Sequence, residues 1–269
     1  MPAAIRIGTQ GWNYKDWVGP FYPSATRPAD YLAVYARAFD SVEVDSTFYA
    51  IPPASTLRGW WERTPPGFLF SLKLPQEITH EARLRDTAGT TELFFERARE
   101  LEDKLGPTLV QLPPDFEPTE LPALATFLER LPHDLPVAIE FRHRGWMEER
   151  TYSLLREHQV ALVLVEGKWI PRRMMLALAE QPTASFSYVR WIGPDRELVD
   201  FSRVQIDRAR ELESWRNAIN TLARQVDVIV GYVNNHYAGH SPATARAIQR
   251  MFGLPVVEPE MLGEQLLLF

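Results

Sequence analysis

Charged side chains stand two residues apart in two short stretches of the sequence. Glu43 is followed by Asp45, and Glu140 is followed by Arg142. Residues two apart lie on the same face of a β-strand, so we expect a pair of carboxylates on one strand and a carboxylate–guanidinium pair on another. Buried groups of this kind shift each other's pKa and can transfer protons or hold a divalent metal. The competing interpretation is a set of ion pairs that only supports the fold.

Further polar residues follow other short apolar runs. Lys73 can bind an anion, and His80 can act as an acid, a base or a ligand. Trp12 lies in a Gly- and aromatic-rich segment that can line a pocket or cap the fold. The remaining polar residues near the ends of such runs are Gln10, Gln111, Glu166, Arg190, Asn234, Asn235 and His236.

The elements that must position these residues are strands alternating with amphipathic helices. Most of the apolar runs are short, as in strands buried on both faces of a parallel sheet. The predicted strands are Ile5–Gly8, Ser41–Val44, Phe68–Leu72, Thr108–Leu112, Pro136–Phe141, Ala161–Val165, Ser185–Trp191 and Val226–Val233. Eight such units without a linker favour an α/β fold, a single closed (β/α)8 barrel. The alternative is an open doubly wound sheet.

In a (β/α)8 barrel the active site lies at the carboxyl ends of the strands. The polar residues above recur at these ends, which favours an enzyme. We assign catalysis to Glu43, Glu140, His80 and Lys73. We assign substrate binding to Gln10, Trp12, Asp45, Gln111, Arg142, Arg190, Asn234, Asn235 and His236.

Composition limits the class of protein. A formal net charge of -6 argues against general electrostatic binding of polyanions, although a local basic cleft remains compatible with it. The absence of cysteine excludes disulfides and thiolate metal sites. No leader segment or apolar run long enough to span a bilayer is visible, so we expect a cytoplasmic protein without a membrane segment.

The chain is expected to form one domain and a short tail. Residues 1–257 make the barrel, whose last clear helix is Pro242–Met251. Pro255 and Pro259 predict a helix-poor stretch after it. Residues 258–269 form the tail.

Six segments, in order, resemble signature blocks of the YecE-like family, domain of unknown function family 72. They are GTQGWNYKDWVGPFYP, FDSVEVDSTFY, FLFSLKLPQEITH, GPTLVQLPPDF, AIEFRHRGW and YVNNHYAGHSPATA. The resemblance covers Ile5 to Met251 and implies a TIM-like barrel in a mostly bacterial, cytoplasmic protein, without an assigned reaction. The family commonly has Ser at the position of Gln10 and Asn at that of Asp45, which weakens any role transferred to these two.

The resemblance also transfers site candidates, without roles. Thr47, Tyr49 and Trp146 join the substrate-binding set on this ground alone. The other candidates inside matching blocks are Glu43, Lys73, His80, Gln111, Glu140, Arg142, Asn234 and Asn235.

Three functions remain open. The first is an enzyme acting on an anionic, phosphate-bearing substrate, in its specific form a metal-assisted hydrolase of phosphodiesters in nucleic acid linked to DNA repair or replication. The second is an acid/base enzyme on a sugar or polyol, with aromatic rings stacking on the ligand. The third is a non-catalytic binding module.

The last residues suggest a partner. Gln265, Leu266, Leu268 and Phe269 resemble the short Gln-Leu-x-Leu-Phe peptide by which bacterial replication and repair proteins bind the DNA sliding clamp, and such peptides are typically terminal. Gln265 can fix the register while the apolar side chains fill a pocket. The alternative is a tail that folds onto its own barrel.

Overall fold

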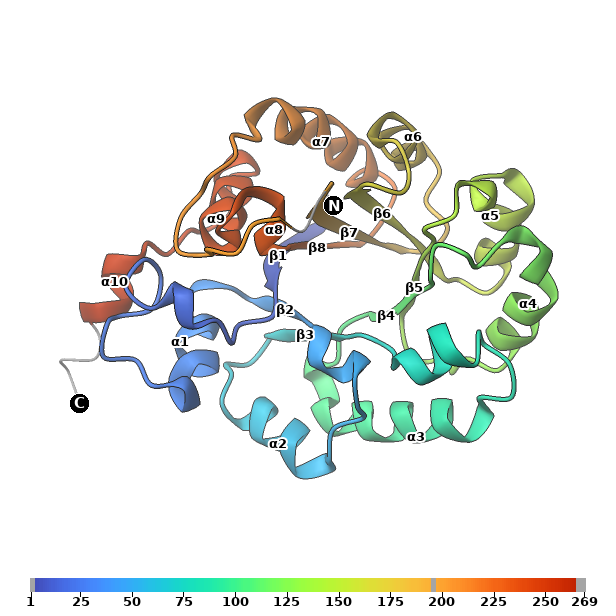
Figure 1. Cartoon of the computed structure of the whole chain (residues 1–269), viewed down its shortest axis with the longest axis horizontal. Coiled ribbons are helices and arrows are strands. Elements are labelled where there is room, and N and C mark those ends of the chain that lie inside the picture. The colour runs from blue at the N-terminus through green and yellow to red at the C-terminus, as the bar shows by residue number, and fades with distance from the viewer. Residues whose placement is uncertain (1–2, 195–196, 265–269) are drawn as a thin grey trace.

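The computed structural model describes residues 3–194 and 197–264, and its centre is an eight-stranded parallel sheet. Figure 1 looks down the resulting barrel. The strands are β1 (Ala4–Gln10), β2 (Ser41–Val44), β3 (Leu69–Leu72), β4 (Thr108–Gln111), β5 (Val137–Glu140), β6 (Ala161–Gly167), β7 (Phe186–Gly193) and β8 (Val228–Val233).

The sheet closes on itself. Its strand order is β3-β2-β1-β8-β7-β6-β5-β4, so β1 pairs with both β2 and β8. Parallel bridges from Phe70 to Leu105 and from Lys73 to Leu109 join the two ends of this order. The fold is therefore a single (β/α)8 TIM-like barrel, and the predicted fold class is confirmed.

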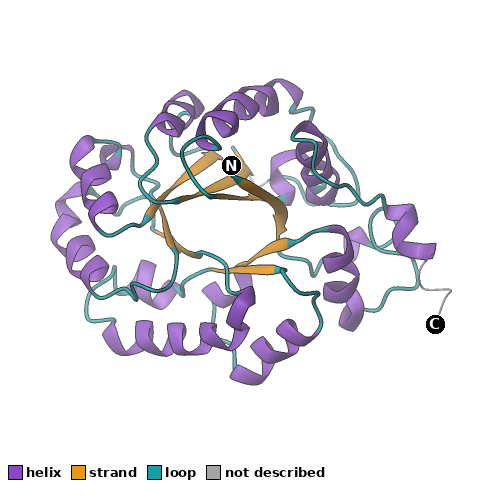
Figure 2. Cartoon of the chain, turned by 180° about the vertical axis from the view of Figure 1, so that it is seen from behind, coloured by secondary structure: helices purple, strands orange, loops and turns teal. Residues whose placement is uncertain are grey.

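Helices surround the barrel on its outside, as Figure 2 shows from behind. They cover the outward faces of strands that are also buried inside, which explains why the strands are almost continuously apolar. They are α1 (Tyr31–Ala38), α2 (Ala54–Glu62), α3 (Ala88–Ala98), α4 (Leu121–Glu129), α5 (Glu149–Glu157), α6 (Arg172–Ala177), α7 (Ala209–Leu222), α8 (Asn235–Ala238), α9 (Ser241–Met251) and α10 (Pro259–Glu264).

The eight predicted strands are present, with ends displaced by at most two residues. The helix predicted from Pro242 corresponds to α9. The helix-poor stretch predicted around Pro259 is wrong, because Pro259 begins α10. Proline is tolerated at the first position of a helix, where its missing N–H has no intrahelical partner to lose.

Helix α10 packs against the barrel through Leu262, whose side chain is fully buried, and α10 contacts α1. The residues predicted to bind a clamp, Gln265, Leu266, Leu268 and Phe269, lie outside the described residues. The division of the chain at residue 258 stays a prediction. Across 3–194 and 197–264, no helix is long and apolar enough to cross a membrane.

Close contact between β1 and β2 depends on Gly8. A Cβ at this position would lie 2.1 Å from the backbone oxygen of Ser41 and 3.0 Å from the Tyr35 hydroxyl. That hydroxyl donates to the Ser41 oxygen and accepts from the Thr9 amide, so α1 holds both strands at this point. The barrel wall here has no room for a methyl group.

We expect Gly8→Ala to lower the free energy of unfolding by ~1–3 kcal/mol, the range for overpacking, since a backbone atom must move. Gly59→Ala in α2 is the matched control, because its added Cβ would meet only the Arg63 guanidinium at 3.8 Å. It should stabilise the helix by ~0.5–1 kcal/mol. Urea unfolding measures both, and an unchanged Gly8→Ala variant would show that the wall yields easily.

Candidate active site

The barrel lumen has an apolar floor and a polar layer at the carboxyl ends of the strands. Strand alternation places Ala138 and Glu140 of β5 on the lumen face, and likewise Tyr188 and Arg190 of β7. Tyr188 and Ala138 belong to a separate buried apolar cluster. Glu140 and Arg190 are buried two residues further along the same strands. Glu43 of β2 completes the polar layer from the opposite wall.

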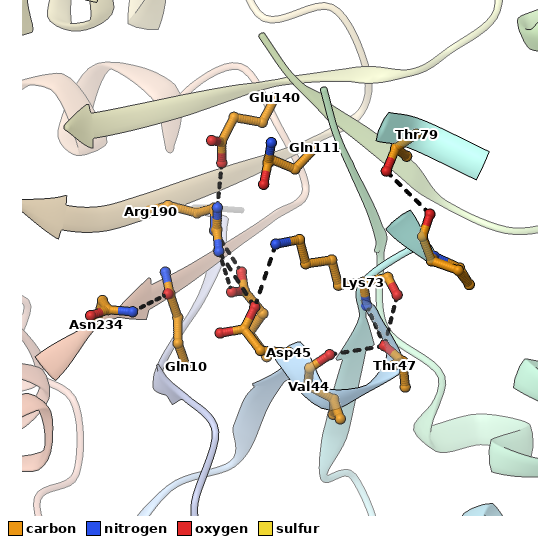
Figure 3. A network of polar contacts seen from close by, with 12 residues as sticks. Gln10, Val44, Asp45, Thr47, Lys73, Thr79, Gln111, Glu140, Arg190 and Asn234 are labelled. Atoms are coloured by element: carbon orange, nitrogen blue, oxygen red, sulfur yellow. Dashed lines mark hydrogen bonds and ion pairs between the residues drawn. The ribbon is translucent and has the colours of Figure 1, made fainter. Parts of the chain in front are cut away.

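Arg190 lies at the centre of this layer (Figure 3). Its Nε donates to Glu43 Oε2 at 2.8 Å and its Nη2 to Glu43 Oε1 at 2.6 Å. Its Nη1 donates to Glu140 Oε2. The Tyr188 hydroxyl adds a 2.7 Å bond to Glu43 Oε2. One buried guanidinium thus pairs with two buried carboxylates.

Three further charged groups surround this core. Arg142 Nε donates to Glu140 Oε1 at 3.0 Å, which confirms the predicted Glu140–Arg142 pair. Asp45 Oδ1 lies 3.8 Å from Arg190 Nη2 and 4.0 Å from Lys73 Nζ. Asp45 is the most exposed of the group, with 36% of its side chain accessible. The six groups balance as three carboxylates and three cations.

The two buried carboxylates differ in acidity. Burial raises the pKa of Glu43 to about 7 against the opposing effect of Arg190, and the nearby Asp45 charge adds to the rise. Burial also disfavours ionisation of Glu140, but Arg190 and Arg142 together hold its pKa at about 2. Glu140 has a second cation beside it where Glu43 has an anion. Glu43 is therefore the carboxyl group that can exchange a proton near neutral pH.

Lys73 approaches the layer from the end of β3. Its Nζ lies 4.0 Å from the centre of the Phe48 ring, and burial lowers its pKa to about 8 although Asp45 opposes the shift. Thr47 fixes the backbone of Lys73, since its hydroxyl bonds to the amide at 3.0 Å and the carbonyl at 2.7 Å. Thr47 itself is buried and acts as support for Lys73.

His80 lies on a short π-helical segment, Glu77–Glu81, beside Lys73. Burial lowers its pKa to about 4, helped by the charges of Lys73 and Arg142, so it is neutral at pH 7. Its Nδ1 is 2.8 Å from the Thr79 hydroxyl, and its Nε2 is 3.4 Å from the Gln111 side chain. His80 can accept or donate a hydrogen bond here, but it is not a cation.

Two cavities adjoin the charged layer, one at Arg142 and one at Asp45. One, of about 330 Å³, is lined by Arg142 with Lys168 and Trp169. The other, of about 460 Å³, is lined by Asp45 and by aromatic side chains that include Trp12. The charged layer is therefore connected to space for a ligand.

Gln10 and Asn234 meet at the carboxyl ends of β1 and β8. Asn234 Nδ2 donates to Gln10 Oε1 at 2.7 Å, as Figure 3 shows. Gln10 Nε2 is buried and has no hydrogen-bond partner among the described residues. It is thus a donor that a ligand or water can satisfy.

Other candidates lie away from the layer. The Trp146 ring stacks on Phe116 and Phe141 and its Nε1 donates to a backbone oxygen, so it supports the wall. Asn235 is buried and accepts from Trp17 and Ser241. Their predicted contact with substrate finds no support in these positions.

Two aromatic candidates and one carboxylate also face elsewhere. Tyr49 is 74% exposed, and the His236 ring packs edge-on against Phe201. Glu166 of β6 pairs with Arg172 on α6 and accepts from Trp215 on α7, so it faces the helix layer. A position at a strand end therefore does not establish which face a side chain takes.

The predicted site residues do not include Tyr188, Lys168 and Trp169, which the structure places at the charged layer or at its 330 Å³ cavity. Tyr188 stands two residues before Arg190, and the alternation used for Glu43 and Asp45 would have placed it in the lumen. Lys168 and Trp169 follow β6, and Trp169 is 41% exposed. No motif distinguishes these two in the sequence.

The carboxylates do not fit a metal centre. Both Glu43 oxygens and both Glu140 oxygens already accept from guanidinium groups. No group of three or more His, Asp or Glu side chains suited to a metal ion occurs in residues 3–194 and 197–264. The oxygens of Glu43 and Glu140 are therefore not available as ligands for a divalent metal.

We expect Glu43 to make the protein less stable as pH rises from about 4.5 towards 7, because its pKa is higher in the folded than in the unfolded state. The slope can reach ~1.4 kcal/mol per pH unit. Glu43→Gln should remove it. Glu140→Gln is the matched variant and should remove a stability gain between about pH 2 and 4.5, since its folded pKa is depressed. Equal slopes for Glu43→Gln and the natural chain above pH 4.5 in urea unfolding would contradict this.

Comparison with known proteins agrees with the fold. The pattern of the family described as "Protein of unknown function DUF72" matches residues 6–265. The UPF0759 protein YecE of Escherichia coli (strain K12) is 37% identical over 61% of this chain, and the match spans 60% of YecE. The UPF0759 protein YunF of Bacillus subtilis is 30% identical over 86% of this chain and 89% of its own length.

Solved structures show the same architecture. A DUF72 family protein from Thermotoga maritima has a TM-score of 0.79 at 27% identity, covering 93% of this chain and 99% of its own. A second, from Enterococcus faecalis, has a TM-score of 0.74 at 21% identity, covering 94% and 99%, and supports the fold alone. The family pattern and the YunF match together establish that this chain belongs to the DUF72 family, as its resemblance to YecE-like proteins implied.

Proposed function

We propose that the carboxyl end of the barrel is an active site that binds an anionic small molecule and transfers a proton without a metal. The observation that carries the proposal is the different surroundings of the two carboxylates paired with Arg190: Glu140 has Arg142 as a second cation, whereas Glu43 has Asp45 nearby. It leaves one carboxyl group that titrates near pH 7 beside one that stays ionised. Enzymes place acid and base groups in this way by pushing the pKa values of neighbouring carboxyl groups apart.

The anion would bind beside Arg142. This guanidinium is fixed by Glu140 through Nε while it lines the 330 Å³ cavity together with Lys168. Two cations facing one cavity favour a phosphate or carboxylate group, although the chain as a whole carries a formal charge of -6. A phosphate-bearing small molecule fits this site. Hydrolysis of nucleic acid through a metal has no support from the carboxylates present.

A sugar or polyol is the second candidate, because the other cavity is aromatic. Trp12, Tyr14 and Trp60 line its 460 Å³ next to Asp45 and Arg63. Sugar rings stack on such side chains, and a carboxylate at the edge can accept from hydroxyl groups. The two candidates differ in which cavity a ligand occupies.

We expect phosphate to raise the melting temperature more than chloride at equal ionic strength, because a specific anion site binds only the folded protein. Arg142→Gln should remove this difference. Arg144→Gln, at an exposed position two residues away, is the matched control and should retain it.

An equal response of the natural chain to phosphate and chloride would overturn the anion proposal. If polyols then protect Trp12 from a fluorescence quencher, the sugar or polyol would be the favoured ligand. A screen of phosphate esters and sugar phosphates, with Glu43→Gln as a blank, tests for turnover. Phosphate binding without any turnover would favour a non-catalytic binding module.

We also propose that Gln265, Leu266, Leu268 and Phe269 bind a bacterial DNA sliding clamp. These residues directly follow α10, which Leu262 anchors to the barrel. Burial of each large apolar side chain contributes ~1.5–3 kcal/mol, so an affinity near micromolar, about -8 kcal/mol, is reasonable after ordering costs.

We expect the full chain to bind the clamp, and a chain ending at Glu264 or the Phe269→Ala variant to lose binding. Calorimetry with purified clamp measures this. If the full and shortened chains bind equally or not at all, and the shortened chain is less stable, the segment is part of the fold and does not bind the clamp.

A further inference from the structure

Lysine is rare in this chain, and two of its four lysines follow barrel strands: Lys73 is buried, whereas Lys168 is exposed. Of 29 Lys and Arg residues, the lysines are Lys15, Lys73, Lys104 and Lys168. The other cationic residues of these 29 are arginines, including those in the buried ion pairs with Glu43 and Glu140. Only a lysine amine can lose its proton and act as a nucleophile under ordinary conditions, because arginine stays charged.

Lys104 shows how this fold stabilises a buried ammonium group. Its Nζ donates to the Trp61 carbonyl at 2.6 Å, to the Thr64 carbonyl at 2.6 Å and to the Thr64 hydroxyl at 3.2 Å. Three acceptors use its three protons, so Lys104 has a structural role. It is 4% exposed, comparable to Lys73 at 8%.

Lys73 is buried to a similar degree but has no such acceptors. In the described part of the chain its Nζ has one ion pair, to Asp45 at 4.0 Å, and the Phe48 ring at 4.0 Å. Figure 3 shows the amine directed towards Asp45 and Arg190. An ammonium group that has no hydrogen-bond acceptor among the described residues and lies next to a guanidinium is poorly stabilised, and both features favour the neutral amine.

The charged groups around Lys73 act in both directions. Arg190 disfavours its protonated form, whereas Asp45, Glu140 and Glu43 favour it. Burial outweighs these and leaves the pKa of Lys73 at about 8. At pH 7 the neutral fraction of such an amine is on the order of 100-fold larger than that of an exposed lysine.

We propose that Lys73 is a nucleophile that forms an imine with the carbonyl group of an aldehyde or ketone substrate. The inference rests on the proposed active site and names its substrate class, a small carbonyl compound that also carries an anionic group for Arg142. Asp45 Oδ1 lies 4.0 Å from the amine and Asp45 lines the 460 Å³ cavity, so this cavity extends to the residue paired with Lys73.

The step balances without a further reactant. The ammonium of Lys73 passes one proton to Asp45, and the neutral Nζ attacks the carbonyl carbon to form a C–N bond. The nitrogen, positively charged after the attack, gives one of its two protons to the carbonyl oxygen, which becomes the hydroxyl of a carbinolamine. Asp45 returns its proton to this hydroxyl, the C–O bond breaks, and water leaves. The nitrogen lone pair completes a protonated imine, so one ammonium and one carbonyl give one iminium and one water.

Reductive trapping tests the proposal on the full natural chain. Glyoxylate is the probe because it has an aldehyde and a carboxylate, and cyanoborohydride reduces any imine to a stable carboxymethyl amine. Peptide mapping by mass spectrometry then compares the initial labelling rates of Lys15, Lys73, Lys104 and Lys168 at pH 7. We expect Lys73 to react at least about tenfold faster than exposed Lys15, given the larger neutral fraction. Its rate should level off above about pH 8, while the Lys15 rate continues to rise.

Two variants separate this inference from the proposed function. Arg142→Gln should slow labelling of Lys73 by glyoxylate but not by acetaldehyde, which has no carboxylate. Arg144→Gln should change neither. If Lys73 is labelled no faster than Lys15 while phosphate still stabilises the natural chain through Arg142, the imine proposal is overturned and the anion site stands. If the Arg142-dependent stabilisation is also absent, both proposals are overturned.

Discussion

A single guanidinium, that of Arg190, makes the polar interior of this barrel possible. Burying two carboxylates costs several kcal/mol for each unless they are paired, and Arg190 pairs with Glu43 and Glu140 at once. The lumen therefore holds a charged layer in addition to its apolar packing. Removal of Arg190 would leave both carboxylates without their shared partner, so the geometry of the layer follows from this residue.

The two carboxylates differ in their other neighbours, and this difference decides which of them can exchange a proton. Glu140 gains Arg142 as a second partner, whereas Glu43 has Asp45 nearby. One positive charge cannot fully stabilise two buried negative charges, so the carboxyl group with the weaker support keeps a proton more readily. Lys73 is affected by the same competition, because Arg190 opposes its protonation. A network that is neutral as a whole thus contains two groups that can change charge near neutral pH.

Much of the fold was predictable because strands buried on both faces leave a plain apolar signal. The alternation rule also identified the pairing of Glu140 with Arg142 from sequence alone. It could not identify the contact of Arg190 with Glu43, which joins residues 147 positions apart and depends on how the barrel closes. It also could not separate the lumen face from the helix face for Glu166.

Residues transferred by family resemblance proved to be of two kinds. Thr47 supports Lys73 directly, but Trp146 and Asn235 are held in packed surroundings away from the charged layer. The matching blocks contain residues that pack in the wall as well as residues of the charged layer, so membership in a block does not distinguish the two. The prediction of a helix-poor stretch at Pro259 was wrong because the effect of a proline depends on whether it begins a helix or interrupts one.

The most direct measurement of the central claim is a carbon-13 NMR titration of the side-chain carboxyl groups, with Glu43→Gln and Glu140→Gln used for assignment. We expect the Glu43 carboxyl to titrate near pH 7 and Glu140 to stay ionised down to about pH 2. If both carboxyl groups titrate together below pH 4, their surroundings stabilise them equally, and the layer contains no carboxyl group suited to acid/base chemistry at neutral pH.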